Sequence, residues 1–526
     1  TKMEKPVDHI ERERIQTDLD TTLLVEAGAG SGKTTSLVER LASIIRTGKA
    51  QIGQIAAITF TNKAADEMRE RFRLKLEEDA RTSIGEEASR FRQALKGIDQ
   101  CFIGTIHSFC GTLLRERPIE AGMDPAFAEM DEEADQAFRD RCWDEYVTAL
   151  RDSGNDAPLQ ELLDLNVDIH TLKTVYDRVS MFSDVAIPLE PVERPDFGII
   201  RETLLPMIEE ALPYVPSNEP ERGWDKLQEK LRASAQMASY SDFRHQGMDL
   251  LKLAQLFEPK VDVVQNRWHD KTKAKQLKER FQDWQNTVLY PFLERWREYL
   301  YPKLISFVLP ALDECRKRRF EGGRVNFQDL LMKSAELLRE NPEVRRYFAE
   351  RYRRILVDEF QDPDPIQAEI MFLLTGEAED PSERDWRKLT PRPGSLFVVG
   401  DPKQSIYRFR RADIAIYNEV KERIRTCGDV LTLTANFRSV EAIGQFVNRQ
   451  FAGKFPVQES EAQAAFAPMR TVKPNPAKSL RKHQTPYGIY TLTYPKMPGG
   501  KQVVAQTDAE RIARYLAWAC AKRINQ

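Results

Sequence analysis

Short apolar runs, each followed by polar residues, recur along the chain and indicate buried strands. Runs of this kind are typical of a parallel sheet that is covered on both faces. They occupy residues 22–25, 55–60, 102–105, 355–357, 396–399 and 430–434. Because the carboxyl ends of parallel strands meet at one edge of an open sheet, the polar residues that follow are expected to line one ligand crevice. The pattern predicts an α/β fold.

Helical periodicity replaces this pattern between about residues 116 and 315. Apolar residues there recur at helical spacing, as at Leu277, Phe281, Trp284 and Val288. Pro291 is expected to kink this helix, and the tryptophans of the segment fit a core better than a binding surface. One basic run is able to brace duplex DNA, although a solvated helix face is the more frequent meaning of such a run. Its members are Lys271, Lys273, Lys275, Lys278 and Arg280.

Composition excludes several classes of protein. A chain of 526 residues is too long for one ordinary domain, and 41% hydrophobic residues are ample for large cores. The cysteines are scattered without a CxxC pair, and the histidines lack metal spacing, so disulfide, zinc-ribbon and iron–sulfur frameworks are not expected. No apolar run approaches the roughly 18 residues of a membrane span. We expect a reduced, cytoplasmic, multidomain protein without a membrane partner.

The charge balance gives no sign of a polyanionic partner. Lys and Arg number 79 and Asp and Glu 82, for a net charge of -3. Any nucleic-acid site must therefore be a local basic track. The chain begins with Thr1 instead of Met, which favours a piece of a longer protein.

A glycine-rich turn follows the first apolar run. It has the sequence VEAGAGSGKTT from Val25 to Thr35, and a helical pattern follows it. Glycines let backbone N–H groups turn inward around a phosphate, and the helix N-terminus adds partial positive charge. Lys33 can reach the β- and γ-phosphates, and the Thr34 hydroxyl can ligate Mg²⁺. The predicted ATP-binding residues are Ala27, Gly28, Ala29, Gly30, Ser31, Gly32, Lys33, Thr34 and Thr35.

Two acids, Asp358 and Glu359, end the apolar run at 355–357. In an ATPase sheet the first acid holds Mg²⁺ and the second can orient the attacking water. Alone this is a weak signal, because strands often end in acids, but a phosphate loop upstream makes it strong. Gln404, after the run at 396–399, lies where an amide can sense a γ-phosphate.

Aromatic and cationic residues follow other runs, a composition typical of surfaces that stack bases and bind phosphates. Phe60 stands beside Thr61 and Asn62, although a core phenylalanine and a helix cap fit these residues equally well. His107 fits a buried hydrogen-bonding residue as well as a DNA contact. In the YRFRR segment, alternating aromatics and cations favour nucleic acid over a solvated loop at Tyr407, Phe409 and Arg410. The TANFRS segment adds a stacking plane and a charge-stabilising cation, Phe437 and Arg438.

The motifs appear in the order AGAGSGKT, ITFTNKAADEMRERF, TIHSFC, ILVDEFQD, VVGDPKQSIYRFR and LTANFRS. In this order they resemble the motifs of the UvrD/Rep-like superfamily 1 DNA helicases. The segment GDPKQSIYRFRRADI is most similar to the RecB/AddA-type helicase subunits of recombination exonucleases. The resemblance covers about residues 1–115 and 320–445. It implies a P-loop NTPase (RecA-like) fold, ATP and Mg²⁺ as cofactors, and 3′–5′ movement on single-stranded DNA. It also implies duplex DNA as a ligand and a nuclease or helicase partner.

The resemblance assigns a role to each site residue. The catalytic set becomes Glu359 as the base, Lys33, Gln404 and Arg438. The Mg²⁺ ligands become Thr34 and Asp358, and Phe437 stacks on adenine. The single-stranded DNA track becomes Phe60, Thr61, Asn62, His107, Tyr407, Phe409 and Arg410.

The chain also departs from the family pattern. Ala27 stands where the strict loop has Gly, and Arg12 or Glu13 occupies the place of the glutamine that contacts adenine. After Arg438 there is no counterpart of two late motifs, which supply a second arginine and further DNA contacts. A nuclease domain with its carboxylate–lysine metal site is absent from the sequence.

The expected domains follow from these patterns. Residues 1–115 and 316–445 form two parts of a first motor domain, 116–315 a helical insertion, and 446–526 a linker and the start of a second motor domain. Pro310 and the EGGR segment at Glu321 to Arg324 are expected to mark the return toward the sheet. The leading hypothesis is an ATP-dependent DNA helicase of recombinational repair. The alternatives are an ATP- and DNA-binding fragment or scaffold with little hydrolysis of its own, and an RNA-directed helicase.

Overall fold

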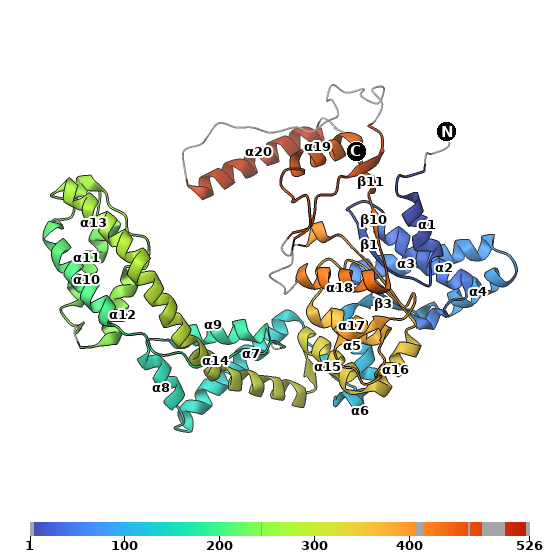
Figure 1. Ribbon diagram of the computed structural model, residues 1–526, viewed down its shortest axis with the longest axis horizontal. Coiled ribbons are helices and arrows are strands. Elements are labelled where there is room, and N and C mark those ends of the chain that lie inside the picture. The colour runs from blue at the N-terminus through green and yellow to red at the C-terminus, as the bar shows by residue number, and fades with distance from the viewer. Residues whose placement is uncertain are drawn as a thin grey trace. The chain divides into compact units, whose positions relative to one another are not determined.

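The computed structural model describes residues 5–182, 184–243, 245–405, 414–460, 463–475 and 500–521. The chain divides into two compact units. The first, which we call the sheet unit, combines Thr1–Phe127 with Phe327–Gln526. The second, which we call the helical unit, is Ala128–Asn326. Figure 1 shows both units.

A six-stranded parallel sheet forms the centre of the sheet unit, in the order β10-β1-β9-β6-β2-β3. Its strands are β1 (Thr22–Ala27), β2 (Ile55–Thr59), β3 (Phe102–Thr105), β6 (Arg354–Val357), β9 (Leu396–Gly400) and β10 (Gly428–Leu433). Side chains alternate between the two sheet faces, so Leu23, Val25 and Ala27 lie in one core with Leu37 and Phe72 of the neighbouring helices. The predicted α/β fold with a parallel sheet is confirmed.

Two groups of helices cover the sheet (Figure 1). The first group is α1 (His9–Thr17), α2 (Lys33–Thr47), α3 (Asn62–Thr82) and α4 (Gly85–Lys96). The second group is α5 (Ile106–Glu116), α15 (Phe327–Glu340), α16 (Pro342–Arg351), α17 (Pro365–Thr375) and α18 (Ile414–Cys427). Coverage of both faces explains why the strands are almost uniformly apolar.

Smaller elements complete the described part of the sheet unit. They are α6 (Pro118–Ala121), α19 (Glu441–Phe451), α20 (Lys501–Ala521), the antiparallel pair β7 (Gly376–Glu377) and β8 (Thr390–Pro391), and the parallel pair β11 (Ala435–Val440) and β12 (Arg470–Lys473). Strand β11, which carries the NFRS residues, therefore pairs with β12 and lies outside the six-stranded sheet. Within the described ranges we find no helix with the length and apolarity needed to span a membrane.

The helical unit consists of α7 (Glu132–Asp152), α8 (Ala157–Asp164), α9 (Ile169–Ser180), α10 (Gly198–Ala211), α11 (Lys226–Met237), α12 (Gly247–Leu256), α13 (Lys271–Trp284) and α14 (Tyr290–Glu321). A π-helical turn, Gln285–Leu289, joins α13 to α14 immediately before Pro291, where we expected a kink. Pro310 lies inside α14 and does not end it; the helix ends at Glu321, where the expected EGGR segment begins.

The tryptophans and the basic run of this unit have structural roles. Trp268, Trp284 and Trp296 are buried in its core. Lys273 Nζ lies 2.8 Å from Glu210 Oε1, and Lys278 Nζ lies 2.6 Å from Asp262 Oδ1. Lys275 pairs with Glu279 and Arg280 with Glu210, so four of the five cations considered for duplex DNA are paired with acids of their own unit, which supports the solvated helix face.

The helical unit starts and ends at the same place. Strand β4 (Ala128–Glu129) pairs in parallel with β5 (Arg324–Val325), and the Ala128 N–H donates to the Gly323 carbonyl at 2.8 Å. The two ends of the inserted segment are therefore neighbours.

Candidate nucleotide site

The phosphate loop connects β1 to α2 through two glycines in left-handed backbone conformations. Gly30 has φ 75° and Gly32, the N-cap of α2, has φ 83°. Residues with a Cβ rarely adopt such angles, so the turn depends on these glycines. The helix begins at Lys33, which leaves the first backbone N–H groups of α2 free to donate to an anion. The strand–turn–helix indicated by the sequence is present.

Lys33 and Glu359, far apart in sequence, form an ion pair with Nζ 2.8 Å from Oε2. Glu359 follows the end of β6 and has φ 57°, a left-handed conformation that costs a non-glycine residue free energy. The Gln361 amide donates to the same carboxylate oxygen at 2.9 Å. The base predicted for hydrolysis is thus held against the lysine predicted to bind phosphate.

Asp358 lies next to this pair and is almost fully buried, with 6% of its surface exposed. Burial raises the pKa of its carboxyl to about 6, the neighbouring Glu359 carboxylate adds to the rise, and Lys33 opposes it. The Asp358 carboxylate and the Thr34 hydroxyl, in the first turn of α2, are hard oxygen donors of the kind that Mg²⁺ prefers. The chemistry of this donor set fits Mg²⁺.

A chain of hydrogen bonds links Gln404 to the same acids. The Gln404 amide donates to Asp401 Oδ2 at 2.8 Å, and Gln361 Oε1 accepts from the Asp401 backbone N–H at 3.1 Å. Gln361 in turn donates to Glu359, as described above. A Cβ placed on Gly28 would lie 4.0 Å from Asp401 Oδ2, so this aspartate borders the phosphate loop. Asp401 and Gln361 were not among the predicted site residues, although both stand within the helicase motifs.

The beginning of β11 is attached directly to the phosphate loop. The Phe437 N–H donates to the Gly30 carbonyl at 2.8 Å, and the Asn436 amide donates to the Ala29 carbonyl at 2.5 Å. A Cβ on Gly30 would come within 2.6 Å of the Arg438 Cβ, which is a second reason for glycine at this position. Arg438 is exposed at the loop, so the structure brings this predicted residue to the nucleotide site.

The N-terminal helix and the residue before it add two side chains to this junction. Asp8 Oδ2 accepts from the Thr434 and Ala435 N–H groups, each at 2.9 Å. Arg12 donates to both oxygens of Asp8 at 2.8 and 3.0 Å, and its guanidinium lies 4.9 Å from the centre of the Phe437 ring. Arg12, one of the two residues that stand where the family has a glutamine, therefore places a cation over the ring of the predicted adenine platform. Asp8 was missed because its partners are backbone groups more than four hundred residues away in sequence.

These features have counterparts in known proteins. Residues 8–425, most of the chain, match the model of the UvrD/REP helicase N-terminal domain. The chain belongs to the UvrD/REP helicase family. The resemblance seen in the sequence is confirmed, and the P-loop NTPase fold follows from membership.

Several curated relatives are named as one subunit of an ATP-dependent helicase/nuclease. The relative from Bacillus licheniformis is 27% identical over 525 residues, which is 89% of this chain and 41% of the relative. The relative from Streptococcus thermophilus is 28% identical over 495 residues, 82% of this chain and 38% of its own length. That from Listeria welshimeri is 26% identical over 471 residues, 79% of this chain and 37% of the relative. The chain thus spans about two fifths of the length of these relatives.

The helicase motifs after β2 and β3 lie at the same edge of the sheet as the phosphate loop, because all six strands are parallel. Phe60 follows β2 and is 47% exposed. Thr61 caps α3, with its hydroxyl accepting the Ala64 N–H at 3.1 Å, and the exposed Asn62 begins that helix. The exposed ring favours a surface role for Phe60 over the core.

His107 lies at the start of α5, half-buried, with its ring centre 5.0 Å from that of Phe327. The remaining residues predicted to contact DNA, Tyr407, Phe409 and Arg410, lie outside the described residues.

Proposed function

We propose that this chain is the nucleotide-hydrolysing part of an ATP-dependent DNA helicase of recombinational repair, one that moves 3′ to 5′ on single-stranded DNA. The observation that carries the proposal is the convergence of Lys33, Asp358 and Glu359 between the phosphate loop and the end of β6. Family membership and the names of the relatives support the assignment. Because these relatives are named as one subunit of a helicase/nuclease, their names also support a protein partner for this chain.

In this proposal the ion pair between Lys33 and Glu359 belongs to the state before nucleotide binds. The phosphates of ATP, held with Mg²⁺, supply the anhydride that is cleaved. Lys33 turns from Glu359 to the phosphates because they carry more negative charge, and Glu359 is then free to accept a proton from the attacking water. Thr34 and Asp358 would hold Mg²⁺, and Gln404 and Arg438 would bind the γ-phosphate.

A second interpretation of the chain by itself is a fragment that binds ATP and DNA but hydrolyses slowly. This alternative is favoured by the span of the chain, about two fifths of its relatives, and by the single NFRS arginine in the sequence. An arginine that stabilises transition-state charge is worth about 10³–10⁵ in rate in related phosphoryl transfer, so a second arginine supplied from outside this chain would raise its rate of hydrolysis strongly.

The test is Glu359→Gln, with Glu87→Gln as the control. Both residues lie in the sheet unit, but Glu87 is an exposed residue of α4 remote in sequence from every motif. Loss of the base is expected to lower DNA-stimulated ATP hydrolysis at least about 100-fold while ATP still binds, since positioned acid–base groups contribute about 10²–10⁴. Hydrolysis that survives in Glu359→Gln refutes this base assignment.

The same assay separates the two interpretations of the chain. Single-stranded DNA is added to this chain and to a longer protein that includes the late motifs, and the rates of ATP hydrolysis are compared. Equal rates of ATP hydrolysis in the two proteins support a complete catalytic site in this chain. A much lower rate for this chain supports the interpretation as a fragment that hydrolyses slowly. Unwinding by the longer protein of a duplex with a 3′ tail, and not of one with a 5′ tail, tests the direction of movement.

A further inference from the structure

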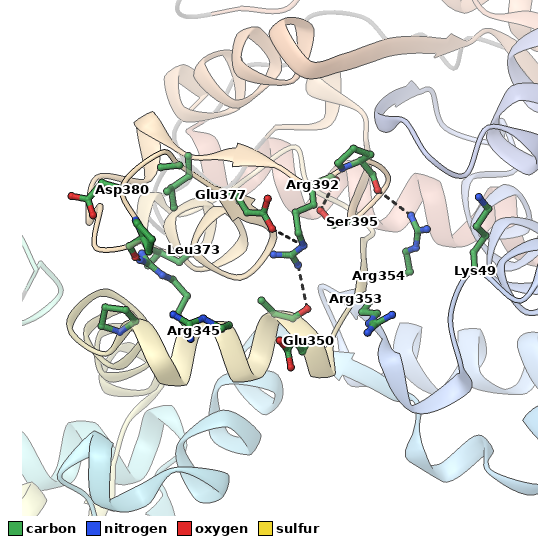
Figure 2. A pocket seen from close by; sticks show the side chains of 18 residues that line it. Lys49, Arg345, Glu350, Arg353, Arg354, Leu373, Glu377, Asp380, Arg392 and Ser395 are labelled. Atoms are coloured by element: carbon green, nitrogen blue, oxygen red, sulfur yellow. Dashed lines mark hydrogen bonds and ion pairs between the residues drawn. The ribbon is translucent and has the colours of Figure 1, made fainter.

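A cavity lies at the amino ends of β6 and β9, away from the phosphate loop at the carboxyl end of β1. Its volume is about 680 Å³, and it is bounded by α16, the start of β6 and the segment 376–395. Figure 2 shows Arg345, Arg353 and Arg392 around this space. We call it the arginine pocket.

The lining of the arginine pocket is strongly cationic. It includes Lys49, Arg345, Arg346, Arg353, Arg354 and Arg392, against the acids Glu350, Glu377 and Asp380. Six cations and three acids in the lining, with Asp20 paired to Lys49 and Arg354 behind it, leave a local charge of +2, whereas the whole chain has a net charge of -3. The pocket is therefore a positive region of a slightly acidic protein.

The buried arginines of the pocket donate mainly to backbone carbonyls. Arg345 donates to the Glu383 carbonyl at 2.6 Å, Arg354 to the Leu19 carbonyl at 2.7 Å, and Arg392 to the Leu374 carbonyl at 3.1 Å. A carbonyl satisfies the hydrogen bond but carries no net charge. Glu377 Oε1 lies 4.0 Å from Arg392, and Asp20 Oδ1 lies 3.6 Å from Arg354, so carboxylate compensation of these two arginines is loose, whereas Lys49 Nζ is paired closely with Asp20 Oδ2 at 2.6 Å.

The electrostatics show a cationic cluster that the nearby acids compensate only in part. Burial lowers the pKa of Arg345, Arg354 and Arg392, the direction expected for cations removed from water. For Arg392, Glu377 opposes this shift of the pKa, while the charges of Arg353 and Arg354 add to it. An anion in the pocket would relieve this repulsion.

Two exposed arginines stand at the pocket with their guanidinium groups available. Arg346 lies on α16, and Arg353 lies between α16 and β6. Their side chains have no hydrogen-bond or ion-pair partner among the residues that the structure describes. Apolar side chains complete the walls, including Leu373, Leu389 and Pro393. The pocket thus combines charged donors with apolar surface.

We propose that the arginine pocket binds a phosphorylated small molecule of nucleotide size, at a second site separate from the phosphate loop. A volume of about 680 Å³ lies within the roughly 300–1,000 Å³ typical of small-molecule sites. Guanidinium groups recognise phosphate oxygens through paired N–H donors, and apolar walls suit a base or another planar group. The inference does not depend on the proposed helicase activity.

The test counts ADP molecules bound per chain by calorimetry in four proteins. The wild type is expected to bind two, Lys33→Ala one at the pocket, and the charge-reversed pair Arg346→Glu/Arg353→Glu one at the phosphate loop. The combination of all three changes is expected to bind none. The control reverses two exposed arginines of α3 and α4 that do not line the pocket, Arg81→Glu/Arg92→Glu, and is expected to keep both sites.

Each outcome has a definite meaning. A wild type that binds one ADP, lost in Lys33→Ala, overturns the proposal while leaving the phosphate loop intact. A second site that survives Arg346→Glu/Arg353→Glu also overturns it. Inorganic pyrophosphate that displaces ADP from Lys33→Ala supports recognition through phosphate. Displacement by poly-glutamate alone, or by duplex DNA alone, overturns the proposed ligand class in favour of an acidic peptide or nucleic acid.

Discussion

Asp358 and Glu359 are adjacent carboxylates with different surroundings. Asp358 is almost fully buried, and burial raises its pKa to about 6. One third of the Glu359 side chain is exposed, and Lys33 and Gln361 hold it. These different environments suit the two roles proposed for them, Asp358 as metal ligand and Glu359 as base.

The raised pKa of Asp358 predicts a pH dependence for Mg²⁺. Below about pH 6 the carboxyl is protonated, so the affinity for Mg²⁺–ADP is expected to fall about tenfold per pH unit. Asp358→Asn should bind Mg²⁺–ADP weakly at every pH and lack this transition, as titration calorimetry on both sides of the transition would measure. An unchanged slope in the variant would assign the pH dependence to another group.

The same group predicts the sign of a stability change. The folded protein binds the Asp358 proton more tightly than the unfolded chain, whose pKa has the ordinary value of 3.8. This residue's contribution to the free energy of unfolding is therefore largest at low pH and is lost as pH rises from about 4 to about 6. The free energy of unfolding is measured with denaturant at several pH values for the wild type and for Asp358→Asn. The difference between the two proteins at each pH isolates that contribution.

Arg12 predicts the nucleotide selectivity. Guanidinium only donates hydrogen bonds, so it can bind acceptors on guanine as well as adenine, whereas an amide also accepts from the adenine amino group. Wild type should therefore discriminate weakly between ATP and GTP. Arg12→Gln should raise the ATP:GTP affinity ratio about 5–10-fold, the worth of one hydrogen bond.

Equilibrium binding of both nucleotides measures this ratio. Arg14→Gln is the matched control, because Arg14 lies on the same helix but pairs with Asp18 and Asp429. A strong preference of the wild type for ATP contradicts the role given to Arg12.

At the scale of elements, the attachment of β11 to the phosphate loop depends on Asn436. This residue is buried, donates to the Ala29 carbonyl, and accepts from the Arg438 and Ser439 N–H groups at 3.0 and 2.7 Å. Asn436→Ala should lower the free energy of unfolding by about 1–3 kcal/mol and weaken nucleotide binding, because buried donors and acceptors lose their partners.

Asn448→Ala is the comparison for this change. Asn448 also bonds backbone groups, at Met469, but lies on α19 away from the loop. It should destabilise the fold while leaving ADP affinity unchanged. Equal losses of affinity in both variants would mean that β11 has no specific effect on the loop.

The elements themselves were largely predictable. Buried parallel strands are apolar on both faces, so their runs stand out; β3 (Phe102–Thr105), for example, has the predicted bounds. Of the two signals for the return toward the sheet, Pro310 was wrong, because a proline in a long helix can be tolerated when the helix is held by packing. The EGGR segment was right, because α14 ends at Glu321 and Gly322 is its C-cap. The polar segment 376–394 contributes β7, β8 and a wall of the arginine pocket, although its composition alone indicates no more than a surface loop.

At the scale of the whole molecule, the division into units predicts that the helical unit can be removed. The described residues of the nucleotide site all belong to the sheet unit. Paired strands lie about 4.8 Å apart, so β4 and β5 bring the ends of the insertion together and a short Gly–Ser linker can replace 128–326.

The shortened protein is expected to bind ADP with an affinity within about threefold of the full chain, well under the roughly 1.4 kcal/mol that a tenfold change represents. Fluorescence binding would measure this, with Lys33→Ala in the shortened protein as the negative control. A folded protein without ADP binding would show that the site needs the helical unit.

The sequence by itself determined the family, the α/β class, the phosphate loop and the two acids after β6. Each is encoded locally, as a run, a spacing or a short motif whose chemistry is complete within a few residues. Only the tertiary structure decided that Asp8 binds the start of β11, that Arg12 lies beside Phe437, and that arginines gather at the amino ends of the strands. Those contacts join segments that are distant in sequence, and pairing between them depends on how the chain packs.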